Sequence, residues 1–180
     1  FLTEQKSVMG DACISLMQFD HEYKKDYSAI DLEDVEGLNS DTYQPRGRTA
    51  LLDAIGKTIS DTKSRLKDDD VDVVIVITTD GLENASLEYR LSDIQKLIKN
   101  CEEELGWKFL YLAADDCSFA QHDDFSVRYE RAVKSGRSNE AHEYASNLMS
   151  KKLGLYRRSR NEKDLEFTKQ ERDNVEDLDC

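Results

Sequence analysis

Apolar residues in the middle of the chain follow two patterns, that of an amphipathic helix and that of a buried strand. Between residues 51 and 66 they recur at spacings of three, four and seven, which places them on one face of a helix. Residues 71–77 are then a nearly continuous run of β-branched side chains, which predicts a strand buried on both faces, as in parallel sheets. The same two patterns return over residues 90–105 and 107–113. This alternation predicts an α/β fold with a doubly wound, mostly parallel sheet and helices on both faces.

Shorter elements are predicted on either side of this central part. Residues 12–19 and 23–29 have the pattern of two strands joined by a tight turn, which predicts a hairpin. Residues 1–6 have the pattern of the last turns of a helix whose beginning is absent. A short strand is expected within residues 125–133, and a helix over residues 139–156.

The composition changes after residue 156. Residues 161–180 hold eight acidic and three basic side chains and few large apolar ones. Such a segment buries little surface, so we expect it to be solvated and either helical in places or disordered. The sequence therefore predicts one domain over residues 1–156 and a charged, flexible tail over residues 157–180.

The charge of the chain narrows the classes of function. The formal net charge is -13, which argues against a nucleic-acid-binding protein, because phosphates are neutralised by clustered Lys and Arg. No apolar run approaches the ~20 residues that a membrane span needs, and the first residues lack the layout of a signal peptide. The four cysteines form no CxxC pair, which favours free thiols. We expect a cytoplasmic protein that binds neither nucleic acid nor membrane.

Two residues are candidates for chemistry at the carboxyl edge of the predicted sheet. Asp80 directly follows the run of β-branched residues, and ligands of open α/β sheets gather at the carboxyl ends of strands. Thr49 precedes the first long helix. Each residue also has an ordinary structural explanation, an Asp-Gly turn for Asp80 and a helix N-cap for Thr49.

Together, the segments that carry these residues resemble a known family. The sequence YQPRGRTALLDAIG at residues 43–56, followed by VIVITTDGLEN at residues 74–84, resembles von Willebrand factor type A (vWA) domains of bacterial and phage proteins. The resemblance extends over about residues 1–155 and includes LMQFD at residues 16–20 and GWKFLYL at residues 106–112.

The resemblance implies a protein-binding module with a metal-ion-dependent adhesion site, which usually holds Mg²⁺. In the family, the site is built from an Asp-x-Ser-x-Ser motif, a Thr in a loop and an Asp after a later strand. Thr49 matches the second element and Asp80 the third, and a carboxylate of the partner protein would complete the coordination. Mg²⁺ prefers such hard oxygen ligands. Glu83 is a further candidate for the surroundings of the metal.

The sequence departs from the family at its start, since it contains no Asp-x-Ser-x-Ser and no strand before residue 1 to carry it. We therefore expect weak or absent Mg²⁺ binding. In the family, the strand that is missing lies between those of residues 12–19 and 71–77. Either these two strands pair directly, or a gap with unpaired backbone groups is left between them, which predicts marginal stability.

Two alternatives to a metal-dependent binding module stay open. One is a Mg²⁺-dependent hydrolase or phosphotransferase of related α/β architecture that uses Asp80. The other is a degenerate scaffold that has lost metal binding. Other chemistry has little support, because the chain has no phosphate-binding glycine motif and its three histidines, with Cys117, show no zinc-site spacing.

Overall fold

The computed structural model describes residues 1–39, 41–43, 47–66 and 71–179. Residues 44–46 of the YQPRGRTALLDAIG segment and the fourth cysteine, Cys180, lie outside these residues. The elements are α1 (Leu2–Lys6), β1 (Cys13–Phe19), β2 (Tyr23–Asp31), η1 (Leu32–Asp34), α2 (Leu51–Leu66), β3 (Val74–Thr79), α3 (Leu91–Leu105), β4 (Lys108–Ala113), α4 (Asp116–Asp124), η2 (Tyr129–Arg131), β5 (Ala132–Lys134), α5 (Asn139–Ser159), η3 (Glu162–Leu165) and α6 (Lys169–Leu178).

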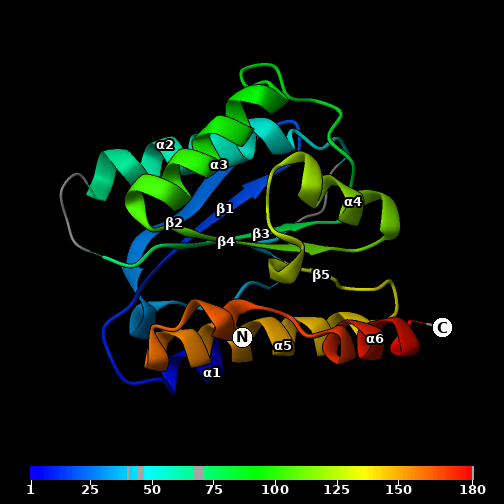
Figure 1. Cartoon of the computed structure of the whole chain (residues 1–180). Helices are drawn as coiled ribbons and strands as arrows, with labels where there is room; N and C mark the ends of the chain where they lie inside the picture. Colours follow the sequence, from blue (N-terminus) through cyan, green and yellow to red (C-terminus); the bar gives the residue numbers. More distant parts are fainter. Residues whose placement is uncertain (40, 44–46, 67–70, 180) are drawn as a thin grey trace.

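The fold is mixed α/β, with a parallel sheet between two layers of helices (Figure 1). Strands β3, β4 and β5 form the parallel sheet in that order, and β1 and β2 form a separate antiparallel hairpin. Helices α2 and α3 cover one face, while α1, α5 and α6 cover the other. The hairpin and the alternation of helices and parallel strands confirm the sequence predictions at this level.

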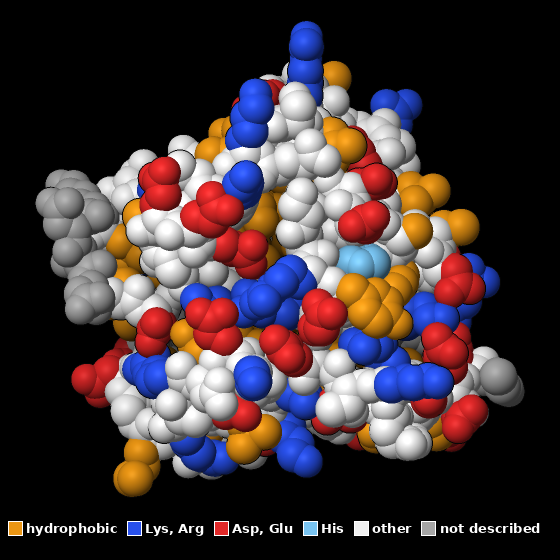
Figure 2. All heavy atoms as spheres, viewed as in Figure 1, with side chains coloured by type: hydrophobic (Ala, Val, Ile, Leu, Met, Phe, Trp, Pro, Cys, Tyr) orange, Lys and Arg blue, Asp and Glu red, His pale blue; other side chains and the backbone are white. Residues whose placement is uncertain are grey.

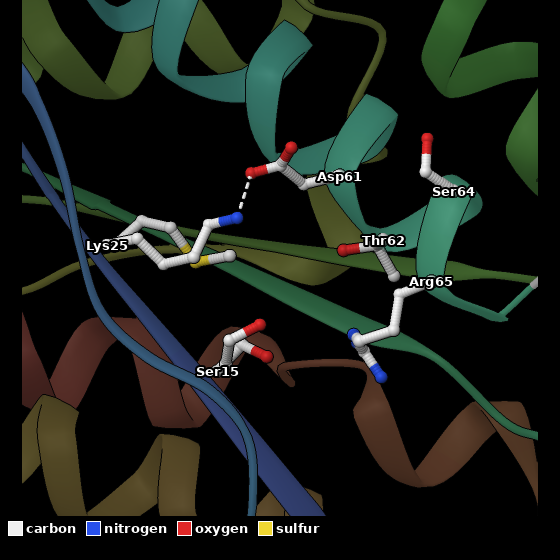
Figure 3. Close-up of a pocket in the computed structure, with 8 residues that line it drawn as sticks. Ser15, Lys25, Asp61, Thr62, Ser64 and Arg65 are labelled. Atoms are coloured by element: carbon white, nitrogen blue, oxygen red, sulfur yellow. Dashed lines mark ion pairs between the residues drawn. The ribbon is translucent and has the colours of Figure 1, made fainter.

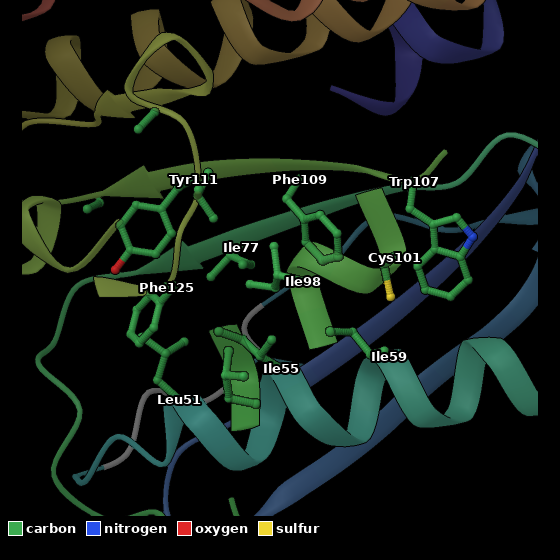
Figure 4. Packing of buried hydrophobic residues seen from close by; sticks show 14 residues of the cluster. Leu51, Ile55, Ile59, Ile77, Ile98, Cys101, Trp107, Phe109, Tyr111 and Phe125 are labelled. Atoms are coloured by element: carbon green, nitrogen blue, oxygen red, sulfur yellow. The ribbon is translucent and has the colours of Figure 1, made fainter. Parts of the chain in front are cut away.

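Strand β4 is the centre of the molecule, and all six of its residues are buried. Its alternate side chains point into two different hydrophobic cores, as the pleat of a strand requires. Phe109 and Tyr111 join the core under α2 and α3 (Figure 4). Leu110 and Leu112 join the core under α5 and α6. Since both faces of β4 are covered, the continuous apolar run in its sequence is accounted for.

Strand β3 is less buried than its sequence predicts. Only Ile77 and Thr79 are buried within it, while Val76 is 37% exposed and Val71 lies outside the strand. The reason is its position, because β3 pairs with β4 on one side and no hydrogen bond joins it to β1 within the described residues. Direct pairing of β1 with β3, one of the two arrangements expected from the sequence, is therefore not observed among the described residues.

The segment after residue 156 packs on the domain, in contrast to the solvated tail expected from its composition. Helix α5 continues to Ser159, and η3 and α6 follow. Three apolar side chains of this segment, Leu165, Phe167 and Val175, are at most 2% exposed and belong to the core under α5 and α6. A few well-placed apolar residues thus outweigh the acidic composition.

A buried arginine connects the C-terminal segment to the parallel sheet. Arg131 is 1% exposed and pairs with Glu102 at 3.2 Å and with Glu162 at 2.8 Å. Lys108 also contacts Glu162 at 2.8 Å, and this hydrogen bond holds the pKa of Glu162 below its ordinary value. Figure 2 shows acidic and basic side chains interspersed over this face of the molecule.

Candidate binding edge around Thr49 and Asp80

Three segments that are distant in sequence meet where β1 and β3 end and α2 begins. The main-chain oxygen of Asp20, directly after β1, accepts a hydrogen bond from the N–H of Ala50 at 2.6 Å. On the other side, the N–H of Asn84 donates to the main-chain oxygen of Thr49 at 3.0 Å, and the Asn84 side chain accepts from the N–H of Thr49 at 3.0 Å. Residues 49 and 50 are therefore held between the end of β1 and the loop that follows β3.

Thr49 lies directly beside the Asp80–Gly81 turn. A Cβ added to Gly81 would lie 2.6 Å from Thr49 Oγ1, so a larger residue at position 81 would displace the Thr49 hydroxyl. The first turn of α2 is capped by other residues, since the N–H of Leu52 donates to Glu83 and the N–H of Asp53 donates to Ser86. The alternative role of Thr49 as an N-cap is not seen, and its hydroxyl makes no hydrogen bond within the described part of the chain.

The loop of residues 80–89, hereafter the 80–89 loop, is fixed to α2 by Asp53. This carboxylate is 7% exposed and accepts three main-chain hydrogen bonds, from Leu87 at 2.9 Å, Glu88 at 3.0 Å and Tyr89 at 2.9 Å. Burial alone would raise the pKa of Asp53, but these three hydrogen bonds outweigh it and hold the pKa below its ordinary value. Asp53 is therefore a fully occupied anchor of the loop.

Glu83 is a second anchor, on the other side of the same loop. Its carboxylate accepts hydrogen bonds from the N–H groups of Leu52, Ala85 and Ser86 and from the Ser86 hydroxyl, at 2.7 to 2.9 Å. Burial opposes ionisation of Glu83, yet the hydrogen bonds hold its pKa below its ordinary value. Its oxygens point to main-chain donors, so the sequence-based suggestion that Glu83 surrounds a metal finds no support in its contacts.

Helix α4 gives the 80–89 loop a third support. Gln121, which is 8% exposed, accepts from the N–H of Glu83 at 2.9 Å, and Thr79 Oγ1 accepts from the N–H of Gly81 at 3.2 Å. The loop is thus connected to α2, α4 and the end of β3.

The solvent-exposed side chains of this loop include two leucines and the carboxylate of Asp80. Leu87 is 94% exposed and Leu82 is 49% exposed. Asp80 is exposed as well, and its carboxylate makes no hydrogen bond or ion pair with the described residues. The anchored loop therefore displays two apolar side chains and the Asp80 carboxylate, which comes directly before the Gly81 that lies against Thr49.

A separate pocket of about 280 Å³ lies between the hairpin and the end of α2 (Figure 3). Its carboxylate, Asp61, is paired with Lys25 at 2.5 Å, and this hydrogen bond raises the pKa of Lys25. The Ser15 hydroxyl in this pocket accepts a hydrogen bond from the N–H of Ala29. The remaining lining residues are Met17, Ser28, Thr62, Ser64 and Arg65. The carboxylate of this pocket is thus occupied by Lys25, and one of its hydroxyls by a main-chain N–H group.

The histidines lie apart from the Thr49 edge or are used locally. His21 contacts Asp20 at 3.2 Å, His122 lies with Nδ1 2.7 Å from the main-chain oxygen of Phe119, and His142 is exposed on α5. Among the described residues, no group of three or more His, Cys, Asp or Glu side chains could hold a metal ion. Cys13, Cys101 and Cys117 are free thiols.

Sequence reasoning singled out Thr49 and Asp80 but missed Asp20, Asp53 and Asn84, which hold this edge together. Asp20 follows a strand directly, as Asp80 does, and that position was a usable signal. The partners of Asp53 and Asn84 depend on the path of a loop more than 30 residues away, which no local pattern encodes.

Comparison of the chain with protein-family models, with curated proteins and with solved structures finds no match. In the part of the chain that the structure describes, every helix is too short or too polar to cross a bilayer.

Proposed function

We propose that this chain is a non-enzymatic protein-binding module of the vWA type, and that it recognises its partner with the edge formed by Thr49 and the 80–89 loop. In this proposal, the hairpin and the parallel sheet are two parts of one doubly wound sheet that lacks its first central strand. The observation that carries the proposal is a loop fixed by Asp53 and Glu83 that nevertheless exposes Leu87 almost completely. A preorganised loop loses little conformational entropy on binding, and exposed apolar side chains on it are typical of interaction sites.

The residues present do not complete a Mg²⁺ site. Mg²⁺ takes six oxygen ligands in near-ideal octahedral geometry. Among the described residues, this edge offers the Thr49 hydroxyl and the Asp80 carboxylate, while Asp53 and Glu83 accept main-chain hydrogen bonds and Asp20 accepts from the N–H of Glu22 and contacts His21. We therefore hold to the expectation of weak or absent Mg²⁺ binding by this chain.

The alternative of a Mg²⁺-dependent hydrolase or phosphotransferase has less support. Such an enzyme needs a second acidic group that can exchange a proton near Asp80. The neighbouring carboxylates Asp53 and Glu83 have lowered pKa values and no free oxygen directed to a substrate. This arrangement favours binding over catalysis.

Titration calorimetry with MgCl₂ tests the metal part of the proposal. We expect no binding in the micromolar range or tighter, and the Asp80→Asn variant should give the same heats as the unmodified chain. A micromolar or tighter dissociation constant that Asp80→Asn abolishes would show that the site is complete and would contradict this expectation.

Selection of peptide binders tests the binding function itself. A library of random linear peptides is displayed on phage and selected against the chain. We expect the enriched peptides to bind the unmodified chain but to bind Leu87→Ser at least about tenfold more weakly, the scale expected for loss of a buried leucine contact. The matched control is Leu105→Ser, because Leu105 is also exposed but lies at the other end of α3 from the loop. Peptides that do not distinguish Leu87→Ser from this control would contradict the proposal.

A further inference from the structure

We infer that the partner is recognised without a metal ion, by a direct ion pair to Asp80 next to an apolar socket for Leu87. The partner is accordingly a protein surface that carries a Lys or Arg beside an apolar pocket. This inference rests on the proposed function and specifies the partner of the same edge.

The first step concerns the oxygens at the edge. A bridging metal would need several carboxylates free of other bonds, and the described residues around Asp80 do not provide them. Asp53 accepts three main-chain N–H groups, and Glu83 accepts three main-chain N–H groups and one hydroxyl. Breaking these bonds to bind an ion would release the very loop that presents the site. Asp20, another acid at this edge, accepts from the N–H of Glu22 at 2.6 Å and contacts His21 at 3.2 Å. Asp80 is exposed, and its carboxylate makes no hydrogen bond or ion pair with the described residues.

The second step concerns charge. A lone carboxylate is complemented directly by a Lys or Arg side chain, whereas a partner carboxylate would repel it in the absence of a metal. The whole chain reinforces this preference, because its net charge of -13 attracts basic partners at a distance and repels acidic ones. Charge complementarity therefore selects a basic group on the partner.

The third step concerns Leu87. Its side chain is 94% exposed, while its own N–H is held by Asp53 at 2.9 Å. An apolar side chain that is held in place yet lacks neighbours gains most when an apolar socket of the partner covers it. Leu82, which is 49% exposed in the same loop, extends the apolar surface. A partner that contacts both residues therefore offers a basic group to Asp80 and an apolar socket to Leu87, and Leu82, two residues after Asp80, continues the apolar surface toward the carboxylate.

The selected peptides of the preceding experiment also test this inference, through their sequences and their dependence on metal. Selection is run once in EDTA and once in millimolar Mg²⁺. We expect the same peptides in both, enriched in Lys or Arg together with large apolar residues. Their affinity should fall about tenfold or more in Asp80→Asn, and added NaCl should weaken binding to the unmodified chain more than binding to this variant.

Other results distinguish a failure of this inference from a failure of the proposed function. Peptides rich in Asp or Glu that bind only in Mg²⁺ and still require Leu87 would overturn the inference and leave the proposed function standing. Peptides that bind Leu87→Ser as well as they bind Leu105→Ser would overturn both. Loss of folding in a variant is detected by circular dichroism, and Asp80→Glu, which keeps the charge, should retain more binding than Asp80→Asn.

Discussion

At the scale of single residues, Gly56 shows how closely the 80–89 loop is packed on α2. A Cβ added to Gly56 would lie 2.6 Å from two ring atoms of Tyr89. The ring cannot easily withdraw, because the N–H of Tyr89 is held by Asp53 at 2.9 Å. Glycine in the middle of a helix is intrinsically unfavourable, so its presence here is explained by the approach of the ring.

We expect Gly56→Ala to destabilise the chain although it improves helix propensity. The gain in propensity is ~1 kcal/mol at most, whereas overpacking of this kind typically costs about 1–3 kcal/mol. Urea unfolding measures the difference. The control is Gly154→Ala in α5, where the nearest atom, Val8 Cγ2, is 3.4 Å from the added Cβ and no clash arises. Equal stability of the two variants would show that Tyr89 does not constrain Gly56.

The carboxylate of Asp53 also holds the 80–89 loop on α2, through hydrogen bonds. In Asp53→Asn, one of the two oxygens that accept from Leu87, Glu88 and Tyr89 becomes an N–H₂ group facing a donor. We expect a loss of about 1–3 kcal/mol in the free energy of unfolding, the usual cost of an unsatisfied buried group. Amide hydrogen exchange at residues 87–89 should accelerate more than at residues of α5. Unchanged exchange in the loop would show that Asp53 is not its anchor.

The pH dependence of this effect has a definite sign. The pKa of Asp53 is lower in the folded chain than its ordinary value of 3.8, so the folded state favours the ionised form. The stabilisation is therefore fully present above the unfolded pKa and is lost as the pH falls through the folded value. The stability difference between the unmodified chain and Asp53→Asn should stay constant near neutral pH and shrink below about pH 4. A difference that grows in acid would contradict this assignment.

At the scale of elements, the starts of two helices could have been predicted from capping residues in the sequence. Helix α6 begins at a capping box, in which the hydroxyl of Thr168 accepts from the N–H of Glu171 and the Glu171 carboxylate accepts from the N–H of Thr168. This Thr-x-x-Glu pattern is visible in the sequence and marks a helix start. The acidic composition of the segment instead led to the prediction of a flexible tail. Helix α4 begins similarly, with a capping box formed by Asp115 and Ser118.

For the strands, the sequence predicts their existence better than their burial. The boundaries of β4 follow closely from its apolar run, and the hairpin follows from its alternation. Strand β3 runs from Val74 to Thr79, whereas its apolar run predicts residues 71–77. Their burial could not be read from sequence, because β3 and β4 have similar runs yet only β4 has a neighbour on each side. Position in a sheet is a property of the whole fold, which a local pattern does not contain.

Removal of one apolar side chain should show whether the C-terminal segment belongs to the folded unit. Phe167 is 2% exposed, and its N–H donates to the main-chain oxygen of Glu130 at 2.6 Å. We expect Phe167→Ala to cost about 3–5 kcal/mol, as for other buried aromatic residues. Leu178→Ala serves as the control, since Leu178 is 40% exposed and should change stability by less than ~0.5 kcal/mol. Thermal unfolding of both variants measures these changes in stability. An unchanged stability of Phe167→Ala would indicate that the C-terminal segment is detached from the folded unit.

At the scale of the whole molecule, the two sheets meet without a hydrogen-bonded ladder between them in the described residues. The hydrogen bonds of Val73 and Thr79 show which side of β3 faces β4. Since successive residues of a strand direct their main-chain groups to alternate sides, Val74, Val76 and Thr78 direct theirs away from β4. An open edge of this composition costs stability and offers a template for association.

We therefore expect marginal stability, with a thermal midpoint below the range of ~45–65 °C that is typical of mesophilic domains. Scanning calorimetry and circular dichroism measure it at several protein concentrations. A cooperative transition within or above that range, independent of concentration, would contradict the expectation. Such a result would mean that packing of the two helical layers suffices without a continuous sheet.

The exposed edge also predicts how association can be suppressed. Val76 is 37% exposed on β3, so Val76→Lys should place a charge at this edge with little loss of packing. Val74, two residues earlier on the same strand, packs against the core under α5 and α6, and Val74→Lys should instead lower the thermal midpoint. Light scattering during incubation just below the midpoint compares the two with the unmodified chain. If β3 is the edge at which copies associate, Val76→Lys delays aggregation and leaves the midpoint nearly unchanged. Aggregation at an unaltered rate in Val76→Lys would instead assign association to another surface, such as the exposed Leu87 of the 80–89 loop.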